Sequence, residues 1–155
     1  MAGMVRAFGG LMTNQNYFST DMEQDVFTPA SVFNYYEPDY GVPGTTLMGG
    51  EFQIFSPNNA ILRTNEVSNL FSQWGSSVQT YGPGTTIDLT LFLPLAANPT
   101  TLVDALDLTL THGVMPAAMK TAIVNAVAAN TDGNLRQVQL GCYLILASNY
   151  YNVWH

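Results

Sequence analysis

Apolar residues in the second half of the chain, residues 58–155, recur at intervals of three and four positions. This spacing places them on one face of a helix and predicts a series of short amphipathic helices. The first helix is predicted to start at a cap-like Asn58 and to stop at Gly75. Its apolar stripe consists of Ala60, Ile61, Val67, Leu70, Phe71 and Trp74.

Three further helices follow, each with its own start and stop residues. In "NPTTLVDALDLTLTHG", Asn98 is a suitable N-cap, Pro99 suits the first turn, and Gly113 suits the position just after the helix. The segment "MPAAMKTAIVNAVAAN" repeats this order, and the last helix runs through "NLRQVQLGCYLILASNYY". Because the connections are short, the helices are expected to be antiparallel neighbours.

The segment "TTIDLTLFLPLA", residues 85–96, is compatible with two structures. Its threonine and isoleucine residues favour a strand. Alternatively, Asp88 would cap a short helix that Pro94 ends.

Residues 1–57 have no helical period beyond a short helix fragment predicted at Met1–Leu11. Proline and glycine recur too densely in the rest of this region for a helix to continue. A structureless segment of this length is unusual in a compact domain, so its many aromatic residues are expected to anchor it. The prediction is one mostly α domain, residues 1–155, in which an antiparallel bundle of about four helices follows a long, ordered, aromatic-rich loop region.

Charged side chains are few and mostly acidic. They make up 10% of the chain, against roughly 25% in a typical soluble domain, and the net charge is −7. The four basic residues are scattered, which excludes the clustered Lys and Arg of a nucleic-acid-binding protein. The apolar runs are too short to span a bilayer, and the N-terminal "MAGMVRAFGGLM" lacks the apolar core of a signal peptide. The small share of charge favours an exported protein, an oligomer or a piece of a larger protein.

The acidic run "TDMEQDVF" is the candidate metal site. It places Asp21, Glu23 and Asp25 at alternate positions, as at the start of a calcium-binding EF-hand loop. Valines stand where that motif requires its turn glycine and its bidentate glutamate, and a solvated acidic loop is the alternative. Asp39, together with Glu37, would add ligands if the two loops meet. Calcium is the one cofactor that this pattern suggests.

His112 is the only internal histidine and a candidate general base, with Asp104 or Asp107 to orient it. In the alternative, a cationic histidine at a helix C-terminus is simply stabilised by the helix dipole. Cys142 is the only cysteine, which excludes an internal disulfide and a Cys-pair zinc site. It lies on the apolar face of the last predicted helix, so a buried, inert thiol is favoured over a nucleophile.

The aromatic residues of the loop region form the candidate binding site. Aromatic rings supply contact area at low entropic cost, so they could form a stacking platform for a sugar or a peptide. In the alternative, the same rings anchor the long loop onto the helices. The candidate binding residues are Tyr35, Tyr36, Tyr40 and Trp74.

Three parts of the chain resemble a known family. They are "QDVFTPASVFNYYEPDYGVPGT" with "GGEFQIFSPNNAILRTN", then "LTHGVMPAAMKTAIVNAVAA", and finally "RQVQLGCYLILASNYYNV". Together they resemble the C-terminal part of the bacterial family called domain of unknown function 1800, with departures at Ala30, Gly50 and Asn149. The resemblance implies a mostly helical, exported-type parent protein several times longer than this chain, with no established activity. The chain would then be a truncated member or a C-terminal fragment.

These observations favour a non-catalytic scaffold or interaction module. Its expected partner is a second copy of the chain or the missing N-terminal region of a parent protein. One alternative is a calcium-assisted hydrolase of a small neutral ester or lactone, with His112 or a carboxylate activating water. A second alternative is a glycan-binding module that uses the aromatic loop.

Overall fold

The computed structural model describes residues 29, 31–32, 34–71, 78–81 and 85–152. This part of the chain is mostly helical, as the hydrophobic pattern predicts. It divides into two compact units, the N-terminal unit within Asn14–Glu66 and the C-terminal unit within Val67–His155. The predicted helix at Met1–Leu11 lies outside the described residues.

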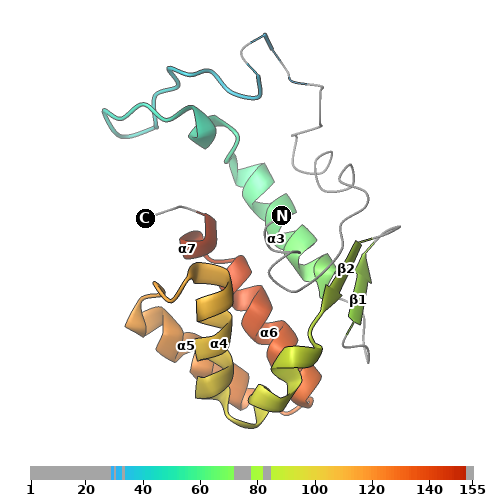
Figure 1. Ribbon diagram of the computed structural model, residues 1–155. Helices are drawn as coiled ribbons and strands as arrows, with labels where there is room; N and C mark the ends of the chain where they lie inside the picture. Colours follow the sequence, from blue (N-terminus) through green and yellow to red (C-terminus); the bar gives the residue numbers. More distant parts are fainter. Residues whose placement is uncertain (1–28, 30, 33, 72–77, 82–84, 153–155) are drawn as a thin grey trace. The chain divides into compact units, whose positions relative to one another are not determined.

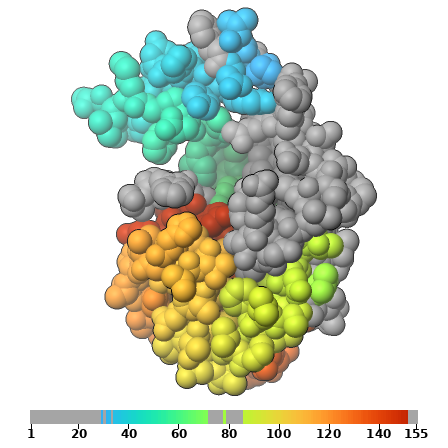
Figure 2. Space-filling view, viewed as in Figure 1, coloured from blue at the N-terminus to red at the C-terminus, as the bar shows by residue number. Residues whose placement is uncertain are grey.

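The C-terminal unit is built around three helices, α4 (Pro99–Thr111), α5 (Ala117–Ala129) and α6 (Asn134–Leu146). All three pack on one another, and the 3-10 helix η2 (Thr90–Ala97) packs on α4 and α6, as Figure 1 shows. The short α7 (Asn149–Asn152) contacts α6 and α4. Figure 2 shows η2, α4 and α5, yellow to orange, as one continuous surface. The fully buried apolar core includes Leu89, Leu102, Val103, Leu106, Val127, Val138, Cys142, Ile145 and Leu146.

The ends of α4 are those that the sequence predicts. Asn98 is the N-cap, and its side-chain oxygen accepts hydrogen bonds from the backbone N–H groups of Thr100 and Thr101 at 3.1 and 3.2 Å. At the other end His112 and Gly113 both take left-handed backbone conformations, with φ of 57° and 78°. Both N–H groups donate to the Asp107 carbonyl and so satisfy the end of the helix.

The segment 85–96 contains both of its predicted structures in succession. Strands β1 (Val78–Tyr81) and β2 (Thr85–Asp88) form an antiparallel pair, in register from Val78 opposite Asp88 to Tyr81 opposite Thr85. Asp88 then caps the turn into η2, because its carboxylate accepts a hydrogen bond from Thr90 N–H at 2.8 Å. Pro94 lies inside η2, which continues to Ala97, so it does not end the helix.

The α3 helix (Pro57–Leu70) begins two residues earlier than a cap at Asn58 would predict. Ser56 caps it, since its hydroxyl accepts a hydrogen bond from Asn59 N–H at 3.1 Å. Pro57 then occupies the first helical position, where its missing N–H costs nothing. Asn58, predicted as the cap, therefore lies within the first turn.

The described loop of the N-terminal unit contains a small hairpin, residues 40–49. The N–H of Val42 donates to the Leu47 carbonyl at 2.9 Å, and the N–H of Gly49 donates to the Tyr40 carbonyl at 3.0 Å. The tip has proline at its second position and Gly44, with φ of 78°, at its third. This is the sequence of a type II turn, in which the third position needs a positive φ. The 3-10 helix η1 (Gly50–Gln53) follows directly.

Candidate functional site

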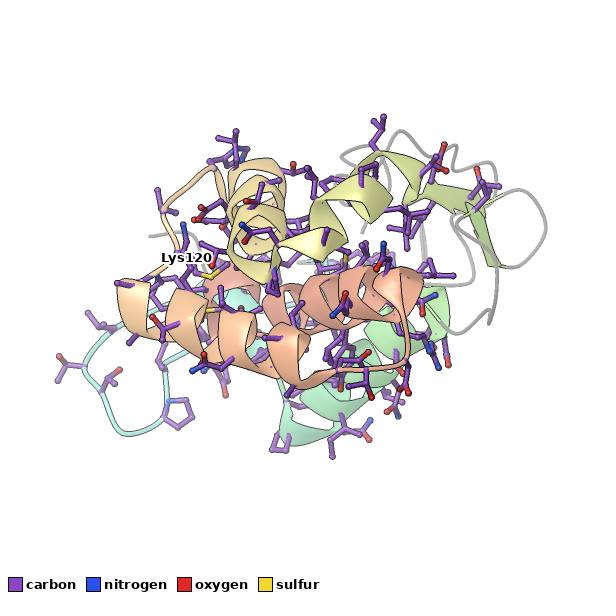
Figure 3. The ribbon with its side chains drawn as sticks, turned by 90° about the horizontal axis from the view of Figure 1, so that it is seen from below. Lys120 is labelled. Atoms are coloured by element: carbon purple, nitrogen blue, oxygen red, sulfur yellow. The ribbon has the colours of Figure 1, made fainter. Side chains whose placement is uncertain are left out.

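The junction of α4 and α5 brings together the charged groups of the candidate site. One of them, Lys120, is labelled in Figure 3. Asp104 and Asp107 lie three residues apart on α4, and therefore on one face of the helix. Lys120 lies in the first turn of α5. Its Nζ is 2.6 Å from Asp107 Oδ2 and 3.0 Å from Asp104 Oδ1. The left-handed pair His112–Gly113 reverses the chain between the two helices, which allows this contact.

The Asp107 carboxylate is buried and accepts a hydrogen bond on each oxygen. Only 1% of the residue is exposed. Its Oδ1 accepts from the Thr111 hydroxyl and, at 3.2 Å, from the Met115 N–H, while Oδ2 faces Lys120. A carboxylate engaged on both oxygens is suited to holding α4, the turn and α5 together.

The same contacts control ionisation at the site. Burial by itself would raise the pKa of Asp107, but hydrogen bonds from Lys120, Thr111 and Met115 outweigh it and hold that pKa below its ordinary value. The hydrogen bonds to Asp107 and then Asp104 raise the pKa of Lys120 above its ordinary value. Both members of the pair are therefore charged at neutral pH. A general base must accept a proton near its working pH, and a carboxylate with a lowered pKa is poorly suited to that role.

Two of the three candidate catalytic residues, Asp104 and Asp107, form ion pairs with Lys120. The third, His112, is exposed at the C-terminus of α4, where its backbone takes the left-handed conformation. The sequence reasoning missed Lys120 and Thr111. A usable sign was present, because a lysine one turn into a helix follows two aspartates on the preceding helix across a short connection that contains Gly113 and Pro116.

The candidate metal ligands divide between the described and undescribed parts of the chain. Asp21, Glu23 and Asp25 lie outside the described residues, and Asp39 is exposed in the loop of the N-terminal unit. Within the described ranges, no three His, Cys, Asp or Glu side chains are grouped so that they could hold a metal ion.

The Cys142 thiol has no exposed surface, and burial raises its pKa well above the ordinary value. Such a thiol is inert at neutral pH.

The candidate binding tyrosines Tyr35, Tyr36 and Tyr40 are all half-buried, and Trp74 lies outside the described residues. The Tyr36 ring packs directly against the backbone of Gly50. A Cβ placed on that glycine would clash with the ring and would lie 2.7 Å from the Glu37 carbonyl oxygen. Tyr36 therefore anchors the loop at the start of η1.

A surface pocket of about 350 Å³ lies in the C-terminal unit, and sequence reasoning did not find it. Its apolar wall comes from Phe71 and from Leu140 and Tyr143 of α6. Its charged and polar groups include Arg136 and Gln139, also of α6. The spacing of four and three residues between Arg136, Leu140 and Tyr143 was a readable sign, because it places these side chains on one helix face.

The turn between α5 and α6 forms the rim of this pocket. Asn130 and Asp132 both line it, and the Asn130 side-chain oxygen accepts a hydrogen bond from Asp132 N–H at 3.1 Å. Gln137 fastens the same turn, since its Nε2 donates to the Asn130 carbonyl at 3.0 Å. These bonds hold the rim in a defined conformation.

Comparison with family models, with curated proteins and with solved structures found no match for the chain. No helix in the described part of the chain combines the length and hydrophobicity of a bilayer-spanning segment.

Proposed function

We propose that the chain is a non-catalytic interaction module that associates with a second copy of itself through the loop of its N-terminal unit. The observation that carries the proposal is a concentration of exposed apolar side chains there. Leu47 and Met48 of the hairpin are 67% and 75% exposed, and Phe52 and Phe55 are 44% and 48% exposed. Clustered exposed apolar residues of this kind mark interaction sites.

The hairpin supports the proposal because its backbone holds these side chains in place. The Val42–Leu47 and Tyr40–Gly49 hydrogen bonds, together with the contact between Tyr36 and Gly50, define the loop conformation. A surface that is already ordered loses less conformational entropy on binding. An isolated hairpin is only marginally stable in water, so a partner that covers it would also stabilise it.

A second copy is the occupant that the chain's composition favours. With 10% charged residues, the chain has few groups to keep apolar surfaces apart. Two copies carry a charge of −7 each, and screening by salt should therefore favour their association. A relationship to domain of unknown function 1800, with an exported parent protein, is part of the same proposal.

The finer architecture belongs to this proposal as well: an antiparallel bundle of about four helices behind an ordered aromatic-rich loop. The mutual packing of α4, α5 and α6 supports the bundle. The hairpin hydrogen bonds support the ordered loop. The contacts of Asp107 support a structural role for that carboxylate rather than the catalytic role in the hydrolase alternative.

Light scattering coupled to size exclusion, at two protein concentrations and two salt concentrations, tests the proposal. The full chain is expected to form a multimer, more completely at higher salt. The double variant Leu47→Ser with Met48→Ser should be monomeric. Leu108→Ser is the matched control, since Leu108 is 68% exposed on α4, and it should leave the multimer intact. A wild-type monomer at micromolar concentration would rule out self-association.

A further inference from the structure

We propose that the pocket lined by Arg136, Gln139 and Tyr143 binds a small monocarboxylate whose body is aromatic or branched and apolar. Its volume of about 350 Å³ falls at the lower end of the range for ligand sites, roughly 300–1,000 Å³. The pocket has room for one aromatic ring and a short acid chain. The inference goes beyond self-association and depends on different residues.

The charge of Arg136 determines the class of ligand. A guanidinium presents planar N–H groups whose geometry matches a carboxylate, and it remains charged at any working pH. Arg136 is half-buried, so water competes less for its charge than it would on an open surface. In a chain with only four basic residues, a cation in a pocket is a selective feature.

A buried amide holds this guanidinium in position. Gln139 is only 3% exposed, and its Oε1 accepts a hydrogen bond from Arg136 Nη1 at 2.6 Å. The two residues lie one helical turn apart on α6. Because the arginine is oriented before a ligand arrives, less conformational entropy is lost on binding.

The apolar wall determines the rest of the ligand. Phe71, 4% exposed, and the side chains of Leu140 and Tyr143 line the same hollow as Arg136. An apolar wall with a few convergent polar groups is the usual composition of a small-molecule site. An aromatic acid would place its ring against this wall and its carboxylate toward the guanidinium.

The charge of Asp132 should affect carboxylate binding in the opposite direction to the charge of Arg136. It is exposed on the rim, and its charge repels an anion entering the pocket. The hydrogen bond that shapes the rim comes from its backbone N–H, so an asparagine at this position should preserve the turn. Neutralising Asp132 should therefore strengthen carboxylate binding, while neutralising Arg136 should weaken it.

The experiment is an NMR titration of the ¹⁵N-labelled full chain with 3-phenylpropionate, its neutral analogue 3-phenylpropan-1-ol and its cationic analogue 3-phenylpropylamine. The acid should bind with millimolar affinity and shift the amide signals of α6. The alcohol should bind at least about tenfold more weakly, because it lacks the charge-assisted hydrogen bonds of the carboxylate. The amine should also bind at least about tenfold more weakly, because its ammonium cannot accept hydrogen bonds from Arg136 and is repelled by the guanidinium. Arg136→Gln should weaken acid binding about tenfold, and Arg136→Lys should weaken it less, since it keeps the charge.

Asp132→Asn should strengthen acid binding about threefold. Leu108→Ser, which changes an exposed side chain of α4 outside the pocket lining, is the control and should leave the affinity unchanged. Three results would overturn the proposal: no shifts with the acid, equal affinity for acid and alcohol, or unchanged affinity in Arg136→Gln. If Arg136→Gln does not fold, Asp132→Asn decides alone, and unchanged or weaker acid binding in that variant refutes the proposal.

Discussion

Replacing Lys120 by methionine should destabilise the protein more than replacing the buried Asp107 by asparagine. Lys120→Met keeps much of the side-chain volume but leaves the Asp107 carboxylate, 1% exposed, without its cation. Asp107→Asn removes the buried charge itself. The asparagine oxygen can still accept hydrogen bonds from Thr111 and the Met115 N–H.

The expected magnitudes follow from burial. Removing one partner of a buried ion pair costs about 3–5 kcal/mol. The Lys120 side chain is 30% exposed, so water screens the pair in part and the loss should be about 3 kcal/mol. Asp107→Asn should cost about 1–2 kcal/mol, because it loses one charge-assisted hydrogen bond. The double variant should be more stable than Lys120→Met alone, since it contains no unpaired buried charge.

The effect should depend on pH in a definite direction. The pKa of Asp107 is lower in the folded chain than its ordinary value of 3.8. Its contribution to stability is therefore complete above the unfolded pKa and is lost as pH falls through the folded pKa. The stability difference between wild type and Asp107→Asn should be largest near neutral pH and should shrink below about pH 4.

Urea unfolding followed by circular dichroism, at neutral pH and at about pH 3, measures these differences. Asp104→Asn is the matched control. Asp104 also contacts Lys120, at 3.0 Å, but its side chain is 56% exposed. An exposed pair is worth about 0–1 kcal/mol, so this variant should remain close to wild type. A Lys120→Met variant as stable as Asp104→Asn would refute the assignment of Asp107 and Lys120 as the structural link between α4 and α5.

Two further variants test the packing of the loop and the capping of α4 by the same unfolding measurement. Gly50→Ala should lower the free energy of unfolding by about 1–3 kcal/mol, because its Cβ would collide with Tyr36. The Cβ of Gly41→Ala would meet nothing within 4 Å, so this control should be nearly neutral. Equal losses of stability in the two variants would contradict the anchoring of the loop. Asn98→Ala should lower the free energy of unfolding by about 1 kcal/mol through loss of the N-cap, and Asn98→Asp should retain most of the stability. An alanine variant as stable as wild type would contradict the role of Asn98 as the cap of α4.

Local features of the fold could be predicted because each depends on only a few neighbouring residues. Asn98 followed by Pro99 starts α4, and Gly113 with its left-handed backbone ends it. These residues act through hydrogen bonds and steric limits that operate within one helical turn. The cap of α3 was misplaced because serine and asparagine are both good caps, and only the backbone path shows that Ser56 accepts the N–H of Asn59.

The candidate site could be predicted only in part. Asp104 and Asp107 were selected as partners of His112, and Lys120 was not connected with them although it lies one turn into the next predicted helix. The structure places Lys120 against both carboxylates. The spacing of Arg136, Leu140 and Tyr143 indicated one helix face, but the Arg136 pocket was missed because Phe71 and the α5–α6 turn meet that face only after the helices pack.

The sequence by itself determined the mostly helical class, the caps of α4 and the burial of Cys142. Each follows from local backbone preference or from the spacing of apolar residues along one helix face. Only the tertiary structure decided that residues 85–96 form a strand and then a 3-10 helix, and that Lys120 pairs with Asp107. Both features depend on which surfaces meet when the helices pack. A polar group that becomes buried there must be hydrogen-bonded or paired with an opposite charge, and this requirement decides the conformation and the ion pair that form.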